Sequence, residues 1–392
     1  YRLLFLLYAE ARDLLPVRER AYYRYSLTRL KRRVAEELDR GEAYSERSAQ
    51  LWGELKALFN IVSHGDRALG VPIYNGGLFR RQTGPAAPAL QLDDLTIADA
   101  FLAPALELLT RRDDGGSQRR VAIDYKDLEV RHLGSIYEGL LEFRLRIGEQ
   151  GALELVNDRG ERKASGSYYT PDYVVDYIVT HTLAPLMEER AERFGRLMAE
   201  VARLREQGAA KASGPKRQEL TRAERQAIAA LLDVRVCDPA MGSGHFLVRA
   251  VDYLTDQIIR IVADYPQMNP ILLMIREVRQ GIVESLRAQG LVPDLERLSD
   301  TNLLRRLVMK RCIYGVDFNP MAVELAKVGL WLHSFTVGAP LSFLDHHLRC
   351  GNSLIGARVD EVRQALEEKP LAEGVGQLEM FGGRFARLLD AT

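Results

Sequence analysis

The stretch Val234-Arg-Val-Cys-Asp-Pro-Ala-Met-Gly-Ser-Gly-His-Phe-Leu247 decides the fold. Val234 and Val236 alternate as in a short buried strand, which the following Asp-Pro pair ends. Gly242 and Gly244 permit backbone angles that residues with a Cβ avoid. Beyond them, apolar residues recur at helical spacing: Leu247, Val251, Leu254, Ile258 and Ile261. The sequence predicts a strand, a glycine turn and a helix, an arrangement that places a ligand crevice at the carboxyl end of an α/β sheet.

Three classes of cofactor can be compared with this turn. A P-loop requires Gly-x-x-x-x-Gly-Lys-Ser/Thr, which occurs nowhere in the chain. A dinucleotide fingerprint requires a third glycine, where Leu247 and its neighbours stand, and an acid about 20 residues further on. The remaining interpretation is S-adenosylmethionine, whose sulfonium and amino acid part need close backbone approach and an acidic neighbour. Asp238 is placed to be that neighbour, although a tight turn without a ligand remains the alternative.

Two later segments end in polar residues as well. A second strand is predicted in Cys312-Ile-Tyr-Gly-Val-Asp-Phe-Asn-Pro320, followed by a helix over 321–335. Its terminal acid, Asp317, can accept both hydroxyls of a ribose. A third segment, Leu348-Arg-Cys-Gly-Asn-Ser-Leu-Ile-Gly356, carries Asn352 and Ser353 at a strand end, suited to the edge of an adenine.

An upstream segment, Gly166-Ser-Tyr-Tyr-Thr-Pro-Asp-Tyr-Val-Val-Asp-Tyr-Ile-Val179, opens a helix. The pattern predicts Thr170 as its N-cap and Pro171 as its first residue. An ordinary capped helix is the alternative to a role in the site. A second helix start is predicted at Thr221-Arg-Ala-Glu224, which matches a capping box.

Four motifs in this order resemble the gamma class of amino-methylating DNA methyltransferases: Ser-Tyr-Tyr-Thr-Pro171, Asp238-Pro-Ala-Met-Gly-Ser-Gly-His-Phe-Leu247, Gly315-Val-Asp-Phe-Asn-Pro320 and Cys350-Gly-Asn-Ser-Leu354. The resemblance is closest to adenine-N6 methylases of Type IIG restriction-modification enzymes and phage-defence systems. It covers most of the chain, since Tyr1–Pro16, Tyr74–Phe79 and Leu133–Leu141 look like that family's helical region.

The resemblance implies a cofactor site for S-adenosylmethionine. Its methionine end would contact Tyr169, Thr170 and Pro171, and Asp238 would face its amino group. Asp317 would bind its ribose and Asn352 its adenine, where the family more often has aspartate. The glycine turn would wrap it with Gly242, Ser243, Gly244 and Phe246, and the predicted set also includes Ala240, Phe318 and Ser353.

One family motif is absent. Such methylases hold the flipped base with Asn/Asp-Pro-Pro-Tyr/Phe, downstream of the segment that corresponds to Cys350–Leu354, and this chain contains no Pro-Pro. We therefore expect a fragment with no catalytic residues of its own, which lacks the target recognition domain. The expected whole protein methylates adenine N6 in double-stranded DNA, and a nuclease domain upstream is possible. A protein glutamine methyltransferase and a non-catalytic DNA- or protein-binding scaffold are the alternatives.

The composition of the chain limits the classes of protein to which it can belong. The 392 residues are 47% hydrophobic and carry 54 basic and 54 acidic side chains, so net charge gives no evidence for nucleic acid. Cys237, Cys312 and Cys350 are expected to be reduced core thiols of a cytoplasmic protein. The histidines near the pocket, His245, His346 and His347, show no metal-ligand spacing and are expected at the surface or bonded to backbone. The absence of a long apolar run predicts no membrane span.

The predicted fold class is α/β, a Rossmann-like class I methyltransferase core behind a mainly helical domain. We expect the helical domain over residues 1–160 and the core over 161–356, with a helical insertion at about 264–310 and a tail at 357–392. Arginines and tyrosines alternate between Arg18 and Arg33, which could follow phosphates but is more typical of a solvated helix face. Residues 205–218 are expected to form an exposed connection between helices.

Overall fold

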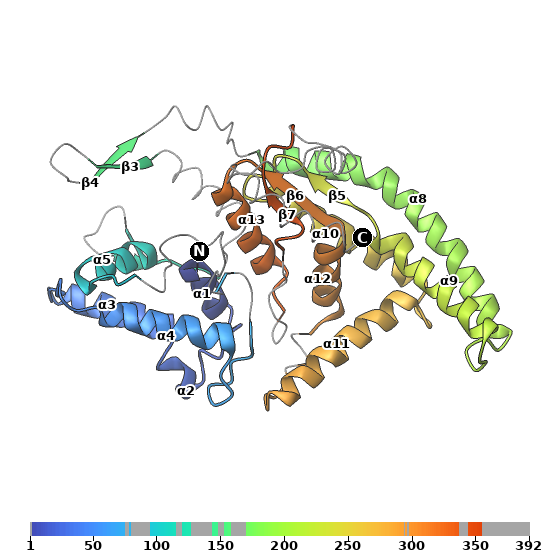
Figure 1. Cartoon of the computed structure of the whole chain (residues 1–392), viewed down its shortest axis with the longest axis horizontal. Coiled ribbons are helices and arrows are strands. Elements are labelled where there is room, and N and C mark those ends of the chain that lie inside the picture. The colour runs from blue at the N-terminus through green and yellow to red at the C-terminus, as the bar shows by residue number, and fades with distance from the viewer. Residues whose placement is uncertain are drawn as a thin grey trace, which may run out of the picture. The chain divides into compact units, whose positions relative to one another are not determined.

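The computed structural model describes residues 2–74, 78–79, 95–114, 120–126, 143–147, 153–157, 170–293, 295, 298–336 and 344–354. The chain divides into two compact units, Tyr1–Gly351 and Asn352–Thr392. The first contains all the described helices and strands, which are drawn in Figure 1. Its described part is mostly helical and contains three small sheets.

The central sheet has three parallel strands in the order β5 (Val236–Asp238), β6 (Ile313–Asp317) and β7 (Leu348–Cys350). All three strands were predicted from the sequence, and parallel pairing brings their carboxyl ends to one edge. The register pairs Asp238 with Gly315 and Asp317 with Cys350. Because cross-strand partners and alternate residues share a face, Asp238 and Asp317 lie on the same face of the sheet.

This face of the sheet is the buried one. It contains Ile313 and Leu348, exposed by 1% and 2%. Helix α10 (His245–Ala263) packs on it, and a Cβ added to Gly315 would lie 2.9 Å from Leu247 Cδ1. The opposite face carries the exposed side chains of Cys237 and Arg349.

Helices connect the strands. Helix α10 leads from β5 into α11 (Pro270–Ala288) and α12 (Asp300–Cys312), which lie in the range of the predicted helical insertion. Helix α13 (Pro320–His333) begins directly after β6, as expected for the crossover to β7. The side chain of Asn319 caps α13 by accepting a hydrogen bond of 2.9 Å from Met321 N, and Pro320 occupies its first position.

Five helices lie in the described part of the chain before residue 160. The helices are α1 (Arg2–Ala11), α2 (Arg20–Tyr23), α3 (Leu27–Asp39), α4 (Gln50–His64) and α5 (Asp99–Thr110). Two antiparallel pairs accompany them: β1 (Arg111–Asp113) with β2 (Arg120–Ala122), and β3 (Phe143–Ile147) with β4 (Leu153–Asn157).

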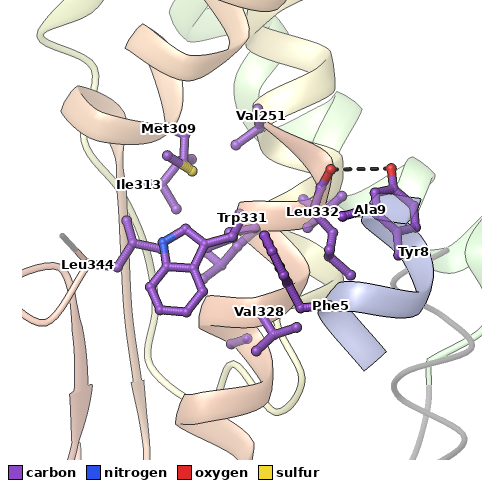
Figure 2. Close-up of a cluster of buried hydrophobic side chains, with 14 of the residues drawn as sticks. Phe5, Tyr8, Ala9, Val251, Met309, Ile313, Val328, Trp331, Leu332 and Leu344 are labelled. Atoms are coloured by element: carbon purple, nitrogen blue, oxygen red, sulfur yellow. Dashed lines mark hydrogen bonds between the residues drawn. The ribbon is translucent and has the colours of Figure 1, made fainter. Parts of the chain in front are cut away.

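Helix α1 packs directly on the helices beside the parallel sheet (Figure 2). Phe5 is fully buried, and the centroid of its ring lies 5.7 Å from the ring centroid of Phe335. The Tyr8 hydroxyl donates a 3.3 Å hydrogen bond to the carbonyl of Leu332 at the end of α13. The hydrophobic core is therefore continuous between the early helices and the residues around the sheet, and the proposed domain division at residue 160 stays a prediction.

The long helix α8 (Asp172–Glu206) starts one residue later than predicted. Pro171 is its N-cap residue and no side chain caps it, so the prediction of Thr170 as N-cap is wrong. Proline has no N–H to leave unsatisfied and favours the start of a helix, but here it lies just outside the first turn, with ψ of 143°.

Helix α9 (Pro215–Leu232) starts earlier than its capping box predicted. Gly214 turns the chain at φ 75° and Pro215 begins the helix, so Thr221 lies inside it. There the Thr221 hydroxyl donates to the carbonyl of Arg217 over 3.0 Å, a bond typical of threonine within a helix. The connection from α8 to α9 thus covers residues 207–214 only.

Two of the three cysteine predictions are wrong. Cys312 is buried, whereas Cys237 and Cys350 are exposed, and all three are free thiols. Cys237 lies on the open face of the sheet, which the strand pattern alone could not reveal. Among the described residues, no helix combines the length and the apolar character needed to cross a bilayer.

Candidate functional site

The glycine turn between β5 and α10 is held to the neighbouring strand. Met241 N donates to the carbonyl of Val316 over 3.0 Å, and Gly244 N donates to the carbonyl of Met241 over 2.8 Å. Both glycines adopt left-handed angles, with φ of 53° at Gly242 and 86° at Gly244. These angles confirm that the turn needs glycine at both positions.

The two glycines differ in what surrounds them. A Cβ at Gly244 would lie 3.0 Å from the Cβ of Ala326 on α13, so this glycine serves the packing of α13. A Cβ at Gly242 would meet no atom within 4 Å. Gly242 therefore borders open space, where a ligand could approach the backbone closely.

Asp317, at the end of β6, fastens the turn with its carboxylate. Oδ2 accepts a 2.8 Å hydrogen bond from Gly242 N, and Oδ1 accepts one of 2.8 Å from Asn319 N. The side chain is only partly buried, and each carboxylate oxygen has a second acceptor site. It can therefore bind the turn and still accept hydrogen bonds from a ligand.

Asp238, at the end of β5, lies in the same part of the molecule. Its Oδ1 accepts a 3.0 Å hydrogen bond from Ala240 N. Burial raises the pKa of Asp238, the Ala240 amide lowers it, and the nearby carboxylate of Asp317 raises it. The two acids thus repel each other at one end of the sheet, and a bound cation would stabilise both.

The start of α8 is tied to the start of α10 by a histidine–carboxylate contact and an ion pair. His245 Nε2 lies 2.9 Å from Asp172 Oδ1, and Arg249 Nε donates to Asp176 Oδ1 over 2.7 Å. Burial lowers the pKa of His245, whereas the Asp172 carboxylate raises it. The pairs bring the segment with Thr170 and Pro171 beside the turn.

Sequence reasoning missed this connection. It assigned His245 to the surface or to backbone bonding, but the residue is 9% exposed and its side chain contacts a carboxylate. The signal was the matching spacing of four residues, Asp172 to Asp176 on one helix and His245 to Arg249 on the other. His347 follows the prediction, because its Nδ1 lies 2.8 Å from the carbonyl of Ile313.

The remaining predicted residues differ in their exposure. Ser243, 8% exposed, and the partly buried Phe246 belong to the turn and the first turn of α10, whereas Ala240 is exposed. Phe318 directly follows Asp317 and is 77% exposed. Its ring is available to stack on a planar ligand.

For three predicted residues, a role in this site stays a prediction. Tyr169 lies outside the described residues. Asn352 and Ser353 belong to the second unit, where Asn352 Oδ1 accepts a 2.9 Å hydrogen bond from Leu354 N. Their expected contact with an adenine stays a prediction. Among the side chains that the structure describes, no group of three or more His, Cys, Asp or Glu could hold a metal ion.

Comparison with known proteins gives one relative by sequence. No family model matches the chain. A protein of Methanocaldococcus jannaschii, provisionally named a type II restriction enzyme and methyltransferase, is 27% identical over 319 residues, which cover 78% of this chain and 22% of that protein. The chain therefore spans about a fifth of the length of the curated relative it matches.

One solved structure is also similar. It is the Type IIL restriction-modification enzyme MmeI in complex with DNA, matched with a TM-score of 0.43 and 19% identity over 90% of this chain and 36% of that chain. A TM-score at this level does not establish a common fold.

Proposed function

We propose that this chain binds S-adenosylmethionine as the cofactor part of a DNA methyltransferase of the gamma class, which methylates adenine N6 in a restriction-modification or phage-defence system. The sequence similarity to a type II restriction enzyme and methyltransferase supports the choice of enzyme class. The order of the four sequence motifs supports adenine as the target base. The strand order β5, β6, β7, with a glycine turn after the first strand, supports a Rossmann-like core.

The observation that carries the proposal is the pair of acids beside an open glycine. Asp238 and Asp317 end adjacent strands on one face of the sheet, and the carboxylate of Asp317 raises the pKa of Asp238. Gly242 leaves room for a ligand between them and the turn. A ligand with two positive centres and a ribose matches these three features, and S-adenosylmethionine has a sulfonium, an ammonium and ribose hydroxyls.

Each residue then has a defined task. Asp238 faces the ammonium group, and Asp317 accepts hydrogen bonds from the ribose hydroxyls while it holds Gly242 N. Phe318 stacks on the adenine of the cofactor. The pairs between α8 and α10 position Thr170 and Pro171 at the methionine end.

When bound, S-adenosylmethionine supplies an electrophilic methyl group. The described residues orient the cofactor and exclude water from one side of it, and the chain contains no Pro-Pro pair that could hold a flipped base. We therefore propose that the base-binding residues come from elsewhere in the whole protein, and that this chain alone binds cofactor without methylating DNA.

Selectivity among cofactors tests the proposal. The melting temperature of the chain is measured with S-adenosylhomocysteine, S-adenosylmethionine, ATP and NAD, each at the same concentration. Only the two S-adenosyl compounds should raise it, because a ligand that binds the native state stabilises it. A shift with ATP or NAD alone would contradict the proposal.

The target is tested separately in cells that carry the whole gene. Genomic DNA should contain N6-methyladenine that disappears when the gene is deleted. Cofactor binding together with methylated protein glutamine in place of methylated adenine would support the glutamine methyltransferase instead. A chain that binds neither S-adenosyl compound would support a non-catalytic scaffold.

A further inference from the structure

Helix α9 presents a basic face on the side opposite its buried residues. Five of its six buried residues form one stripe, namely Leu220, Ala223, Ala227, Ala230 and Leu231, and the sixth, Leu232, is the last residue of the helix. At 100° per residue, the opposite half of the helix carries three arginines and three neutral polar residues. This α9 basic face consists of Arg217, Gln218, Thr221, Arg222, Arg225 and Gln226, which line one common surface.

Acids of the described part of the chain do not neutralise the charges on this face. Arg217, Arg222 and Arg225 are exposed, and among the residues that the structure describes no carboxylate forms an ion pair with any of them. The two acids of α9 lie at the borders of the face. One of them, Glu224, is engaged by Arg205 from α8 over 2.6 Å.

The arginines near the start of the chain provide the contrast. Guanidinium nitrogens of Arg33 and Arg29 lie 2.7 Å and 3.4 Å from carboxylate oxygens of Glu54. A guanidinium nitrogen of Arg32 lies 2.7 Å from a carboxylate oxygen of Glu36. These pairs agree with a solvated helix face, and they reduce the attraction of that region for anions. Within the described residues, the α9 basic face keeps its positive charge, although the whole chain has a net charge of zero.

The spacing of the face suits a polyanion with regularly repeated charges. Arg217 and Arg225 lie two helical turns apart, about 12 Å along the axis, with Arg222 between them. Guanidinium groups bind phosphates with two parallel hydrogen bonds, and glutamine and threonine side chains add neutral contacts to phosphate and sugar oxygens.

We propose that the α9 basic face binds the phosphate backbone of double-stranded DNA. The arginines, unpaired within the described residues, favour a polyanion in general, whereas the choice of DNA as that polyanion rests on the proposed function. Contacts to phosphates give affinity and orientation without reading the base sequence. The surface would therefore hold the duplex in register while other residues select the target.

The test compares two double variants of the full chain. Arg222→Gln with Arg225→Gln removes two charges from the α9 basic face. Arg276→Gln with Arg287→Gln removes two charges from exposed arginines of α11 and serves as the matched control. Binding of a fluorescent duplex of arbitrary sequence is measured by anisotropy over a series of salt concentrations, and melting temperatures confirm that both variants are folded.

The α9 variant should bind the duplex roughly tenfold more weakly at moderate salt. Its plot of log affinity against log salt should be shallower by up to about 1.8, since each lost phosphate contact removes about 0.9 from the slope. The control should retain the slope of the unmodified chain. Equal losses in both variants would show a net-charge effect and overturn the proposal, as would an unmodified chain that binds no duplex.

Cofactor titration of the same proteins separates this inference from the proposed function. The α9 variant should bind S-adenosylmethionine as the unmodified chain does, because its substitutions lie outside the glycine turn. Duplex binding that depends on α9 in a chain that binds no cofactor would refute the proposed function and leave the phosphate surface standing. If the chain binds the cofactor and the α9 variant retains the full duplex affinity, the proposed function stands and the phosphate surface on α9 is refuted.

Discussion

Two carboxylates of the chain, Glu10 and Asp317, bind backbone amides in different surroundings. Glu10 on α1 is 4% exposed and accepts hydrogen bonds from the Tyr22 hydroxyl, Leu27 N and Thr28 N over 2.9, 2.8 and 2.6 Å. Asp317 accepts two such bonds and stays partly exposed beside Gly242.

The difference separates a structural acid from a binding acid. Glu10 is enclosed by donors of its own chain, and it holds the start of α3 against α1. Asp317 stands at a strand end, next to another acid and an open glycine, so it can serve a ligand. Loss of Glu10 should therefore affect stability, and loss of Asp317 should affect binding.

The largest effect is expected from Glu10→Ala. The substitution leaves the buried amide of Leu27 and the partly buried amide of Thr28 without their acceptor, which should lower the free energy of unfolding by roughly 3 kcal/mol. Chemical denaturation measures it. Glu54→Ala removes a partly exposed carboxylate and should cost less than about 1 kcal/mol. Equal losses would mean that burial does not distinguish the two acids.

The two glycines of the turn should give the next largest effects. Gly244→Ala combines a left-handed backbone with contact against Ala326, and we expect a loss of about 2 kcal/mol in unfolding free energy. Gly242→Ala meets only the backbone strain, about 1 kcal/mol, because its Cβ would point into open space.

The glycine variants also test whether the cofactor lies beside Gly242. At Gly242 the added methyl group should weaken binding of S-adenosylmethionine more than it weakens folding, as isothermal titration and denaturation together can show. Unchanged affinity in folded Gly242→Ala protein would place the ligand elsewhere.

The smallest effect is a pH dependence that comes from His245. Burial lowers its pKa below the value of about 6.5 expected in the unfolded chain, so the folded state binds fewer protons. Stability should therefore fall as the pH drops from 7.5 through 6.5, until the folded histidine is protonated as well. Asp172, Asp176 and Arg249 surround the ring and oppose one another in setting its pKa.

The variant His245→Asn isolates this contribution. Its unfolding free energy should change less between pH 7.5 and 5.5 than that of the unmodified chain, measured by urea denaturation at each pH. A steeper decline in the variant would show that the ring is protonated more readily in the folded state, against the sign derived from its burial.

Local sequence signals predicted the turn well. The angles of Gly242 and Gly244, the acids at the ends of β5 and β6, and the start of α10 at His245 all follow from residues close together in the chain. Such features depend on backbone sterics and strand length, which a few residues determine.

Features that depend on distant segments were not predicted. The pairing of His245 with Asp172 requires α8 and α10 to lie side by side, and the exposure of Cys237 depends on what covers its face of the sheet. Helix α9 begins at Pro215, after Gly214, and not at the capping box that was predicted at Thr221. Two competing start signals were present there, and only one was recognised.

Isothermal titration of the chain with S-adenosylmethionine, beside Asp317→Ala and the control Asp252→Ala, tests the central claim most directly. The account predicts saturable binding at one site, weakened in Asp317→Ala by about 1.5 to 3 kcal/mol, or roughly ten- to a hundredfold. Asp252 pairs with His333 over 2.8 Å away from the glycine turn, so its loss should leave the affinity unchanged in folded protein. A folded chain that binds no cofactor, or binds it equally well without Asp317, would contradict the account.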